Sequence, residues 1–229
     1  MLPRRGRRAT SAAMNERQAA IFDLDGVLVD TARHHYAAWK RLAAELGFDF
    51  TEAQNERLKG VSRDESLRIL LECGGLERSA EERKALAERK NRWYVEMLSG
   101  LTEADLLPGS MACLTRLKAM GIPAALASAS KNAPMILRQL AIADLFRAVV
   151  DGNSGAKVKP DPELFLMAAA KMRIEPRACV VFEDAAAGIE AAHAAGMYAV
   201  GVGRRSNLPE ADIIVPDLAH CDLAALFPA

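Results

Sequence analysis

The strongest constraint on the fold is an alternation of short apolar segments with helical segments that begins after Pro108-Gly109. The apolar segments have the length of strands, and they occupy residues 122–127, 148–150, 178–182, 197–202 and 213–215. An earlier apolar run at residues 19–29 is interrupted by two aspartates, and Asp30 or Thr31 can then cap a helix that ends at Gly47. Strands that alternate with helices form parallel sheets with helices on both faces. We therefore predict an α/β fold built on a doubly wound parallel sheet.

The segment that follows the first strand differs from the rest of the chain, because it shows helical patterns and no strand candidate. Two Ser-x-x-Glu sequences in it, which begin at Ser62 and Ser79, have the spacing of a capping box at a helix start. This helical block interrupts the alternating pattern. We therefore predict a helical cap domain at residues 33–104, inserted into an α/β catalytic core formed by residues 19–32 and 105–229.

The composition excludes several kinds of partner. Thirty Lys and Arg residues balance thirty Asp and Glu residues, so no net charge attracts nucleic acid or an anionic membrane. No apolar run approaches the roughly 20 residues that span a bilayer. The four cysteines form no CxxC pair, which predicts reduced structural thiols rather than a zinc site or a disulfide framework. We expect a cytoplasmic monomer that binds small molecules and neither nucleic acid nor membranes.

The N-terminal segment is interpreted separately from the fold. It holds four arginines within its first eight residues but no apolar stretch of the kind that a secretory signal requires. We expect residues 1–18 to be a disordered extension. Two alternatives stay open: the Arg-rich, acid-poor composition is loosely that of an organellar transit peptide, and Met14 could be the real start.

Polar side chains follow several of the predicted strands. Asp23 and Asp25 lie two residues apart after the first strand, so both carboxylates point to the same side, and Gly26 lets the backbone turn closely. Later strands are followed by Ser128, Lys159 and Glu183-Asp184. Ligands of open parallel sheets bind beyond the carboxyl ends of the strands, where these groups would converge. An aspartate pair alone is more often turn or cap chemistry, so the interpretation depends on the whole set.

A cluster of carboxylates at this edge implies a cation. Two unit charges about 4 Å apart, at an effective dielectric constant of about 20, interact by about 4 kcal/mol, so the carboxylates would repel one another without a positive ion. Ligation by oxygen atoms alone is typical of Mg²⁺, which binds through one or two carboxylates and a substrate phosphate. We therefore predict Mg²⁺ as the cofactor.

Four motifs of the haloacid dehalogenase superfamily are matched, in order along the chain, by Asp23-Leu24-Asp25-Gly26, Ser128, Lys159-Pro160 and Glu183-Asp184. This ordered set is highly specific, and the chain resembles that superfamily, which implies its Rossmannoid core. The resemblance implies that Asp23 is a nucleophile that becomes an aspartyl phosphate, and that Asp25 is the general acid and base. Ser128 and Lys159 would neutralise and position the transferring group. The implied Mg²⁺ ligands are Asp23, the Asp25 backbone carbonyl and Asp184, with Glu183 assisting.

A second set of residues resembles the sugar-phosphate mutases of that superfamily. It consists of Asp30-Thr31, His35, Trp39, the run from Lys59 to Arg63, Arg89-Lys90-Asn91 and the run from Ser128 to Asn132. A mutase needs two phosphate sites, because its bisphosphate intermediate must bind in either orientation. Arg63 is our candidate for the second site, since a basic residue at a capped helix start suits an anion. The resemblance implies interconversion of β-D-glucose 1-phosphate and glucose 6-phosphate through β-glucose 1,6-bisphosphate.

The same resemblance assigns the remaining roles. Thr31 and His35 would orient Asp25, and Lys90 would reach the substrate from the cap. The predicted substrate contacts are Gly60, Val61, Arg63, Lys90, Ala129, Ser130, Lys131 and Asn132. Simpler interpretations exist for some of these: His35, Arg63 and Lys90 could be ordinary surface groups, and Trp39 is better explained by cap packing than by sugar binding.

Two other functions are compatible with the core motifs. A sugar-phosphate phosphatase would use the same core with water as the acceptor, and a non-catalytic sensor would keep the fold without the reaction. Ala185 departs from the family pattern, in which a serine often follows the Glu-Asp pair. This departure affects the expected detail of the metal site and leaves every ionisable group in place.

Overall fold

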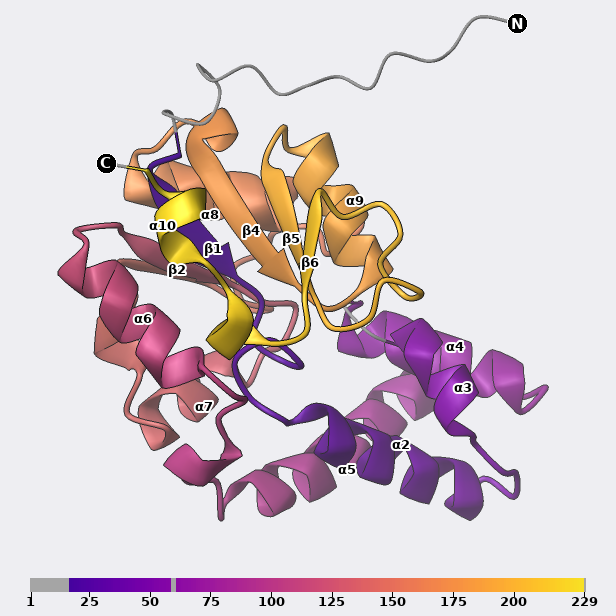
Figure 1. Cartoon of the computed structure of the whole chain (residues 1–229). Coiled ribbons are helices and arrows are strands. Elements are labelled where there is room, and N and C mark those ends of the chain that lie inside the picture. The colour runs from indigo at the N-terminus through magenta and orange to yellow at the C-terminus, as the bar shows by residue number, and fades with distance from the viewer. Residues whose placement is uncertain (1–16, 59–60, 229) are drawn as a thin grey trace, which may run out of the picture.

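A parallel sheet forms the centre of the computed structural model, which describes residues 17–58 and 61–228 (Figure 1). The strand order is β3-β2-β1-β4-β5-β6, and every neighbouring pair is parallel. The strands are β1 (Ala19–Phe22), β2 (Ala124–Ala127), β3 (Ala148–Val150), β4 (Cys179–Glu183), β5 (Tyr198–Val202) and β6 (Ile213–Val215). The predicted doubly wound sheet is confirmed. Except for its last two residues, the predicted N-terminal extension lies outside the described residues.

Helices cover both faces of the sheet, which is why the central strands are apolar on both sides. On one face Phe22 stacks on Phe182 with ring centroids 4.5 Å apart, in a core shared with α6, α7 and α10. On the other face Ile21 and Val181 pack against α8 and α9. These helices are α6 (Ser110–Ala119), α7 (Ala133–Gln139), α8 (Glu163–Met172), α9 (Ala186–Ala194) and α10 (Leu223–Leu226).

Only the first part of the apolar run at residues 19–29 is a strand. After β1 the chain makes a buried turn, in which Gly26 has a φ of +86° and Leu28 N–H donates to Leu24 O at 3.0 Å. Leu24, Leu28 and Val29 are all fully buried. The apolar residues beyond Phe22 therefore anchor the turn that carries the two aspartates, rather than extend the strand.

The helical block lies beside the carboxyl ends of the strands, as Figure 1 shows. Trp39, Leu42, Leu70 and Leu86 belong to a hydrophobic core of its own. Its elements are α2 (Ala32–Glu45), α3 (Glu52–Asn55), η1 (Glu56–Leu58), α4 (Arg63–Cys73) and α5 (Ala80–Leu98). This arrangement fits a cap domain, although the boundaries at residues 33 and 104 stay a prediction.

The two predicted capping boxes differ in the structure. At α5, Ser79 N–H donates to Glu82 Oε2 at 2.8 Å, and Glu82 N–H donates to Ser79 Oγ at 3.3 Å, which completes the box. At α4 the Ser62 hydroxyl accepts the Glu65 N–H at 3.1 Å. The reciprocal half of this second box was predicted wrongly, because the Glu65 carboxylate pairs with Arg68 at 2.8 Å instead.

Short 3₁₀ helices occupy several of the connections. Besides η1 they are η2 (Glu103–Asp105), η3 (Ala143–Leu145), η4 (Pro176–Ala178) and η5 (Leu218–His220). Within residues 17–58 and 61–228, none of the helices combines the length and the apolar character that crossing a bilayer requires.

Candidate active site

The predicted core residues meet at the carboxyl edge of the sheet. The strand register places Phe22 of β1 opposite Leu126 of β2 and Phe182 of β4, so the residues that follow these strands are neighbours. The polar groups brought together at this edge are Asp23, Ser128, Glu183 and Asp184, with Lys159 supplied by the loop after β3. Residues far apart in the sequence thus form one site, as the motifs predicted.

Lys159 is the buried centre of this arrangement. Its Nζ lies 2.5 Å from Asp23 Oδ1 and 2.7 Å from Glu183 Oε2, and its side chain is fully buried. Burial alone would lower the pKa of Lys159, but the charges of Asp23 and Glu183 raise it above its ordinary value. Lys159 therefore stays charged and fixes the orientation of the Asp23 carboxylate.

Three carboxylates form a candidate cation site. Oxygen atoms of Asp23, Glu183 and Asp184 all lie within 4.8 Å of one another. Both oxygens of Glu183 already accept hydrogen bonds, one from Lys159 at 2.7 Å and the other from Ala185 N–H at 3.1 Å. Burial raises the pKa of Glu183. A donor set made of oxygens alone fits a hard divalent cation.

Two glycines make room for these carboxylates. A Cβ at Gly26 would lie 2.3 Å from Oδ2 of Asp184, and a Cβ at Gly188 would lie 2.0 Å from Cδ of Glu183. Gly188 is the third residue of α9, so this helix begins directly against Glu183. Gly188 was not predicted from the sequence, because a glycine inside a helix carries no sign of which side chain it faces.

Asp25 has a pKa suited to proton transfer. Thr31 donates its hydroxyl hydrogen to Asp25 Oδ1. Thr31 holds the N-cap position of α2, but its side chain makes no capping hydrogen bond there, contrary to one of the two predicted caps. Burial and then the charge of Asp23 raise the pKa of Asp25 to about 6.

Replacing Thr31 with valine is expected to shift the pH dependence of catalysis upward. The Thr31 hydrogen bond lowers the pKa of Asp25, so its loss raises that pKa further. The catalytic acid is protonated Asp25, and the protonated fraction falls as the pH rises through its pKa. With a higher pKa, Thr31→Val is therefore expected to lose the activity that depends on this acid at a higher pH than the wild type. The measurement is kcat/KM against pH for the wild type, Thr31→Val and the control Thr115→Val, which changes an exposed threonine on α6. A downward shift in Thr31→Val, or an equal shift in the control, would contradict the assigned contact.

The cap contributes a buried lysine. Lys90 Nζ lies 2.8 Å from His35 Nδ1, and 4.5 Å and 4.6 Å from the ring centroids of Trp39 and Tyr94. Lys90 is only 2% exposed, so its interpretation as a solvated surface charge is wrong. Burial lowers the pKa of both His35 and Lys90 well below their ordinary values, and nearby positive charges add to this effect. His35 contacts Lys90, and its role in orienting Asp25 stays a prediction.

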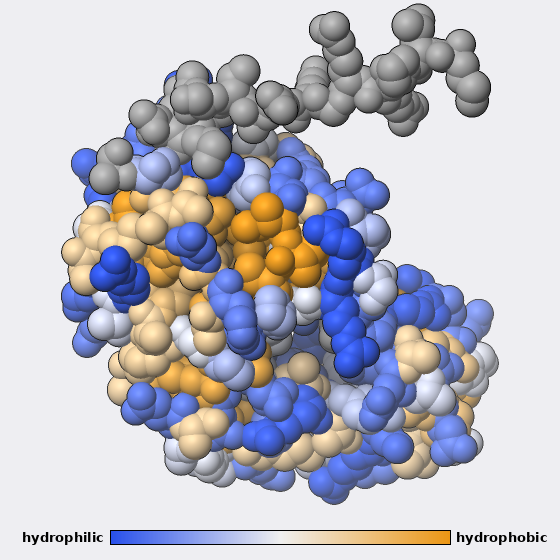
Figure 2. Space-filling view, viewed as in Figure 1, coloured by the Kyte–Doolittle hydropathy of each residue, from blue (hydrophilic) through white to orange (hydrophobic). Residues whose placement is uncertain are grey.

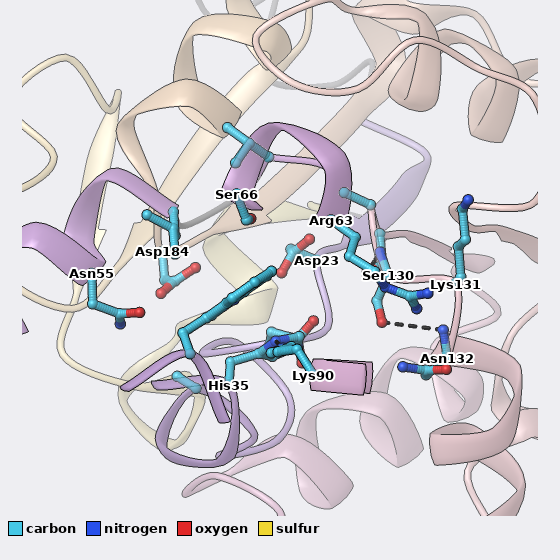
Figure 3. Close-up of a pocket in the computed structure, with 17 residues that line it drawn as sticks. Asp23, His35, Asn55, Arg63, Ser66, Lys90, Ser130, Lys131, Asn132 and Asp184 are labelled. Atoms are coloured by element: carbon cyan, nitrogen blue, oxygen red, sulfur yellow. Dashed lines mark hydrogen bonds between the residues drawn. The ribbon is translucent and has the colours of Figure 1, made fainter. Parts of the chain in front are cut away.

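The loop after β2 presents a series of hydroxyl groups. Ser128 Oγ accepts the Ser130 N–H at 3.1 Å, and Ser130 Oγ accepts the Asn132 N–H at 3.2 Å. The second of these bonds is drawn in Figure 3. Because each hydroxyl acts as acceptor in these bonds, its own hydrogen can be donated to an anion. This geometry suits the binding of phosphate oxygens.

A pocket between the core and the helical block joins these groups. Figure 2 shows the surface hollowed at this place, with mostly hydrophilic residues at the rim. Figure 3 shows the Arg63 side chain extending from α4 toward the loop that carries Ser130. The predicted residues that line the pocket are Asp23, Asp25, His35, Val61, Arg63, Lys90, Ser128, Ala129, Ser130, Lys131, Asn132 and Asp184. Thr31 and Lys159 contact the pocket residues Asp25 and Asp23, and Glu183 contacts Lys159. Gly60 is outside the described residues.

Asn55 and Ser66 line the pocket and were not predicted from the sequence. Trp39 also lines it, besides packing in the cap core as predicted. Ser66 follows Arg63 by three residues on α4, so it shares a helix face with that arginine. This spacing could have identified Ser66. No comparable signal pointed to Asn55, which ends a short helix.

The comparisons with known proteins agree with this geometry. The family model of haloacid dehalogenase-like hydrolases matches residues 18–196, and the chain belongs to this family. Within it, the chain is 48% identical to the β-phosphoglucomutase of Bacillus subtilis over 91% of this chain and 93% of that protein. The crystal structure of β-phosphoglucomutase from Clostridium difficile superposes with a TM-score of 0.86 at 43% identity, over 90% of this chain and 93% of the other. A phosphorylated carbohydrates phosphatase of Thermotoga maritima is 35% identical over 79% of this chain and 82% of its own length.

Proposed function

We propose that this protein is a β-phosphoglucomutase, which interconverts β-D-glucose 1-phosphate and glucose 6-phosphate through an aspartyl phosphate and β-glucose 1,6-bisphosphate. The observation that carries the proposal is a single pocket that contains two sets of groups. Asp23 and Ser128 would receive and hold the reacting phosphoryl group, Arg63 and Ser130 would bind a second phosphate, and all four residues line the pocket. An enzyme that binds a bisphosphate in either orientation needs both sets. The similarity to the Bacillus subtilis enzyme extends over 91% of the chain and supports this function.

Asp23 is the proposed nucleophile. Lys159 holds its Oδ1, which leaves Oδ2 as the attacking atom. A bond forms between this oxygen and phosphorus, the bond from phosphorus to the sugar oxygen breaks, and Asp25 gives its proton to that sugar oxygen. In the second half, the Asp25 carboxylate accepts the proton of the other sugar hydroxyl, which takes the phosphoryl group from Asp23. A pKa of about 6 lets Asp25 alternate between these two states near neutral pH.

The acidic cluster is the proposed Mg²⁺ site. Asp23, the Asp25 backbone carbonyl and Asp184 would hold the ion, with Glu183 assisting through its position in the cluster. When bound, Mg²⁺ neutralises negative charge on the transferring phosphoryl group. Lys159 supplies a further positive charge through its contact with Asp23. The Ser128 hydroxyl can donate to a phosphate oxygen.

The cap residues are proposed to bind the rest of the substrate. Arg63 would pair with the phosphate that does not react, together with the loop from Ser128 to Asn132. Lys90 would contact the sugar phosphate from the cap, and His35 would position Lys90 through their 2.8 Å contact. Val61 lines the pocket and keeps its predicted role as a substrate contact, and the same role stays a prediction for Gly60.

The assay that tests this function compares isomerisation with phosphate release. With Mg²⁺ and a trace of glucose 1,6-bisphosphate, the purified protein is expected to form glucose 6-phosphate from β-glucose 1-phosphate much faster than it releases inorganic phosphate. The α anomer and other hexose 1-phosphates, assayed in parallel, define the substrate. Release of phosphate as the dominant reaction would replace the mutase with the alternative function, a sugar-phosphate phosphatase. The similarity to the Thermotoga maritima phosphatase is the observation that favours that alternative.

A non-catalytic sensor is the third function to test. Such a protein would bind sugar phosphates without becoming phosphorylated, whereas both the nucleophile and the acid are present here. Mass spectrometry after incubation with the bisphosphate distinguishes them, since only the enzyme acquires an acid-labile adduct on Asp23. The cytoplasmic location, the monomeric state and the absence of a nucleic-acid partner stay predictions from the sequence.

A further inference from the structure

A hydrogen bond joins the cap to the loop that follows β2. Nδ2 of Asn132 donates to Oδ1 of Asn91 at 2.9 Å. Asn91 lies on α5 directly after Lys90, and Asn132 ends the loop at the N-terminus of α7. Asn132 lines the pocket, whereas the lining residues on α5 include Lys90 and not Asn91. Asn91 therefore contacts the pocket through its hydrogen bond to Asn132 rather than as a lining residue.

This bond continues a series of contacts inside the loop. Asn132 N–H donates to Ser130 Oγ, and Ser130 N–H donates to Ser128 Oγ, at 3.2 Å and 3.1 Å. The series begins at the end of β2, beside the reacting group, and ends on the cap helix. Asn91 and Asn132 are both partly buried, so water competes less for their bond than it would at an open surface.

We propose that Asn91 is a positioning residue that couples closure of the cap to the loop that binds the second phosphate. This inference rests on the proposed function. When the cap is closed, Asn91 holds Asn132 and the loop in the conformation that grips the phosphate. When the phosphate is bound, the ordered loop presents Asn132 to Asn91 and favours the closed cap. Closure excludes water from the phosphorylated aspartate, so the phosphoryl group passes to the sugar rather than to water.

The chain offers a matched control for this bond. Gln139, near the end of α7, donates through Nε2 to the carbonyl oxygen of Ser99 at 2.9 Å, at the C-terminus of α5. This bond also links α7 to α5, but it is exposed and involves no residue of the pocket. Gln139→Ala therefore removes a bond between the same two helices without disturbing the loop.

The test compares Asn91→Ala, Gln139→Ala and the wild type. For Asn91→Ala we expect kcat/KM for isomerisation to fall about fivefold, mainly through KM, because one net hydrogen bond is worth about that factor. The phosphate released per isomerisation should rise by a similar factor, since the cap closes less often over the phosphorylated enzyme. Gln139→Ala should change neither quantity. Asn91→Asp keeps an acceptor oxygen facing Asn132 and should restore most of the wild-type ratio of phosphate release to isomerisation.

The outcomes separate this inference from the proposed function. An unchanged release ratio in Asn91→Ala, or an equal change in Gln139→Ala, overturns the coupling while the wild type still isomerises. If the wild type only hydrolyses its substrate, the mutase proposal fails. The coupling is then tested by the KM for hydrolysis of glucose 6-phosphate. In that case a higher KM in Asn91→Ala but not in Gln139→Ala supports the coupling, and equal KM values overturn it. Equal melting temperatures of the variants establish that none has lost its fold.

Discussion

Replacing Asp23 with asparagine is expected to abolish phosphoryl transfer, with a loss in kcat on the order of 10⁴-fold or more. Asparagine keeps the shape of the side chain but lacks the anionic oxygen that attacks phosphorus. The variant should also remain without an acid-labile phosphoryl adduct after incubation with glucose 1,6-bisphosphate. Steady-state kinetics and mass spectrometry of the intact protein measure the two effects.

The matched control for this substitution is Asp30→Asn. Asp30 lies in the same segment, but its side chain is 45% exposed and its ion pair with Arg33 spans 3.7 Å. This variant should keep nearly full activity and should be phosphorylated like the wild type. Persistent phosphorylation of Asp23→Asn at another residue would show that Asp23 is not the nucleophile.

Replacing Lys159 with methionine is expected to lower the free energy of unfolding by about 3–5 kcal/mol, the usual cost of removing one partner from a buried ion pair. The substitution keeps most of the side-chain volume but removes the positive charge between Asp23 and Glu183, which would then repel each other across the vacated position. Urea denaturation without divalent cations measures the change. Activity should be lost as well, because the orientation of the Asp23 carboxylate is no longer fixed.

Lys157→Met provides the comparison within the same loop. Lys157 Nζ lies 3.6 Å from Asp161 Oδ2, but its side chain is 75% exposed, so its ion pair is worth at most about 1 kcal/mol. A loss of stability in Lys157→Met as large as that in Lys159→Met would mean that the loop as a whole, and not the buried charge, determines stability.

The fold was predictable because its pattern is local. Runs such as residues 178–182 are apolar throughout, since a strand covered on both faces has no polar side, and helical segments separate them. The turn after Phe22 was less predictable, because a buried turn and a buried strand both need apolar residues. The capping box at Ser62 failed in part for a similar reason: spacing does not reveal that Arg68 competes for the Glu65 carboxylate.

The candidate site was predictable where its residues follow strands. Asp23 and Lys159 are 136 residues apart in sequence, yet both stand at strand ends or in the loops beyond them, and the parallel sheet brings these together. The cap contacts are different, because helix packing and not strand order decides them. The bond between Lys90 and His35 and the place of Asn55 in the pocket depend on how α2, α3 and α5 pack against one another.

The position of Trp39 allows substrate binding to be followed by intrinsic tryptophan fluorescence. The chain has two tryptophans, and both belong to the helical block: Trp39 lies in the pocket under Lys90, while Trp93 carries the Arg41 guanidinium 4.0 Å above its ring. A Trp93→Phe variant would emit from the pocket alone. Its fluorescence would follow the arrival of a sugar phosphate in real time, without a dye or a coupled enzyme.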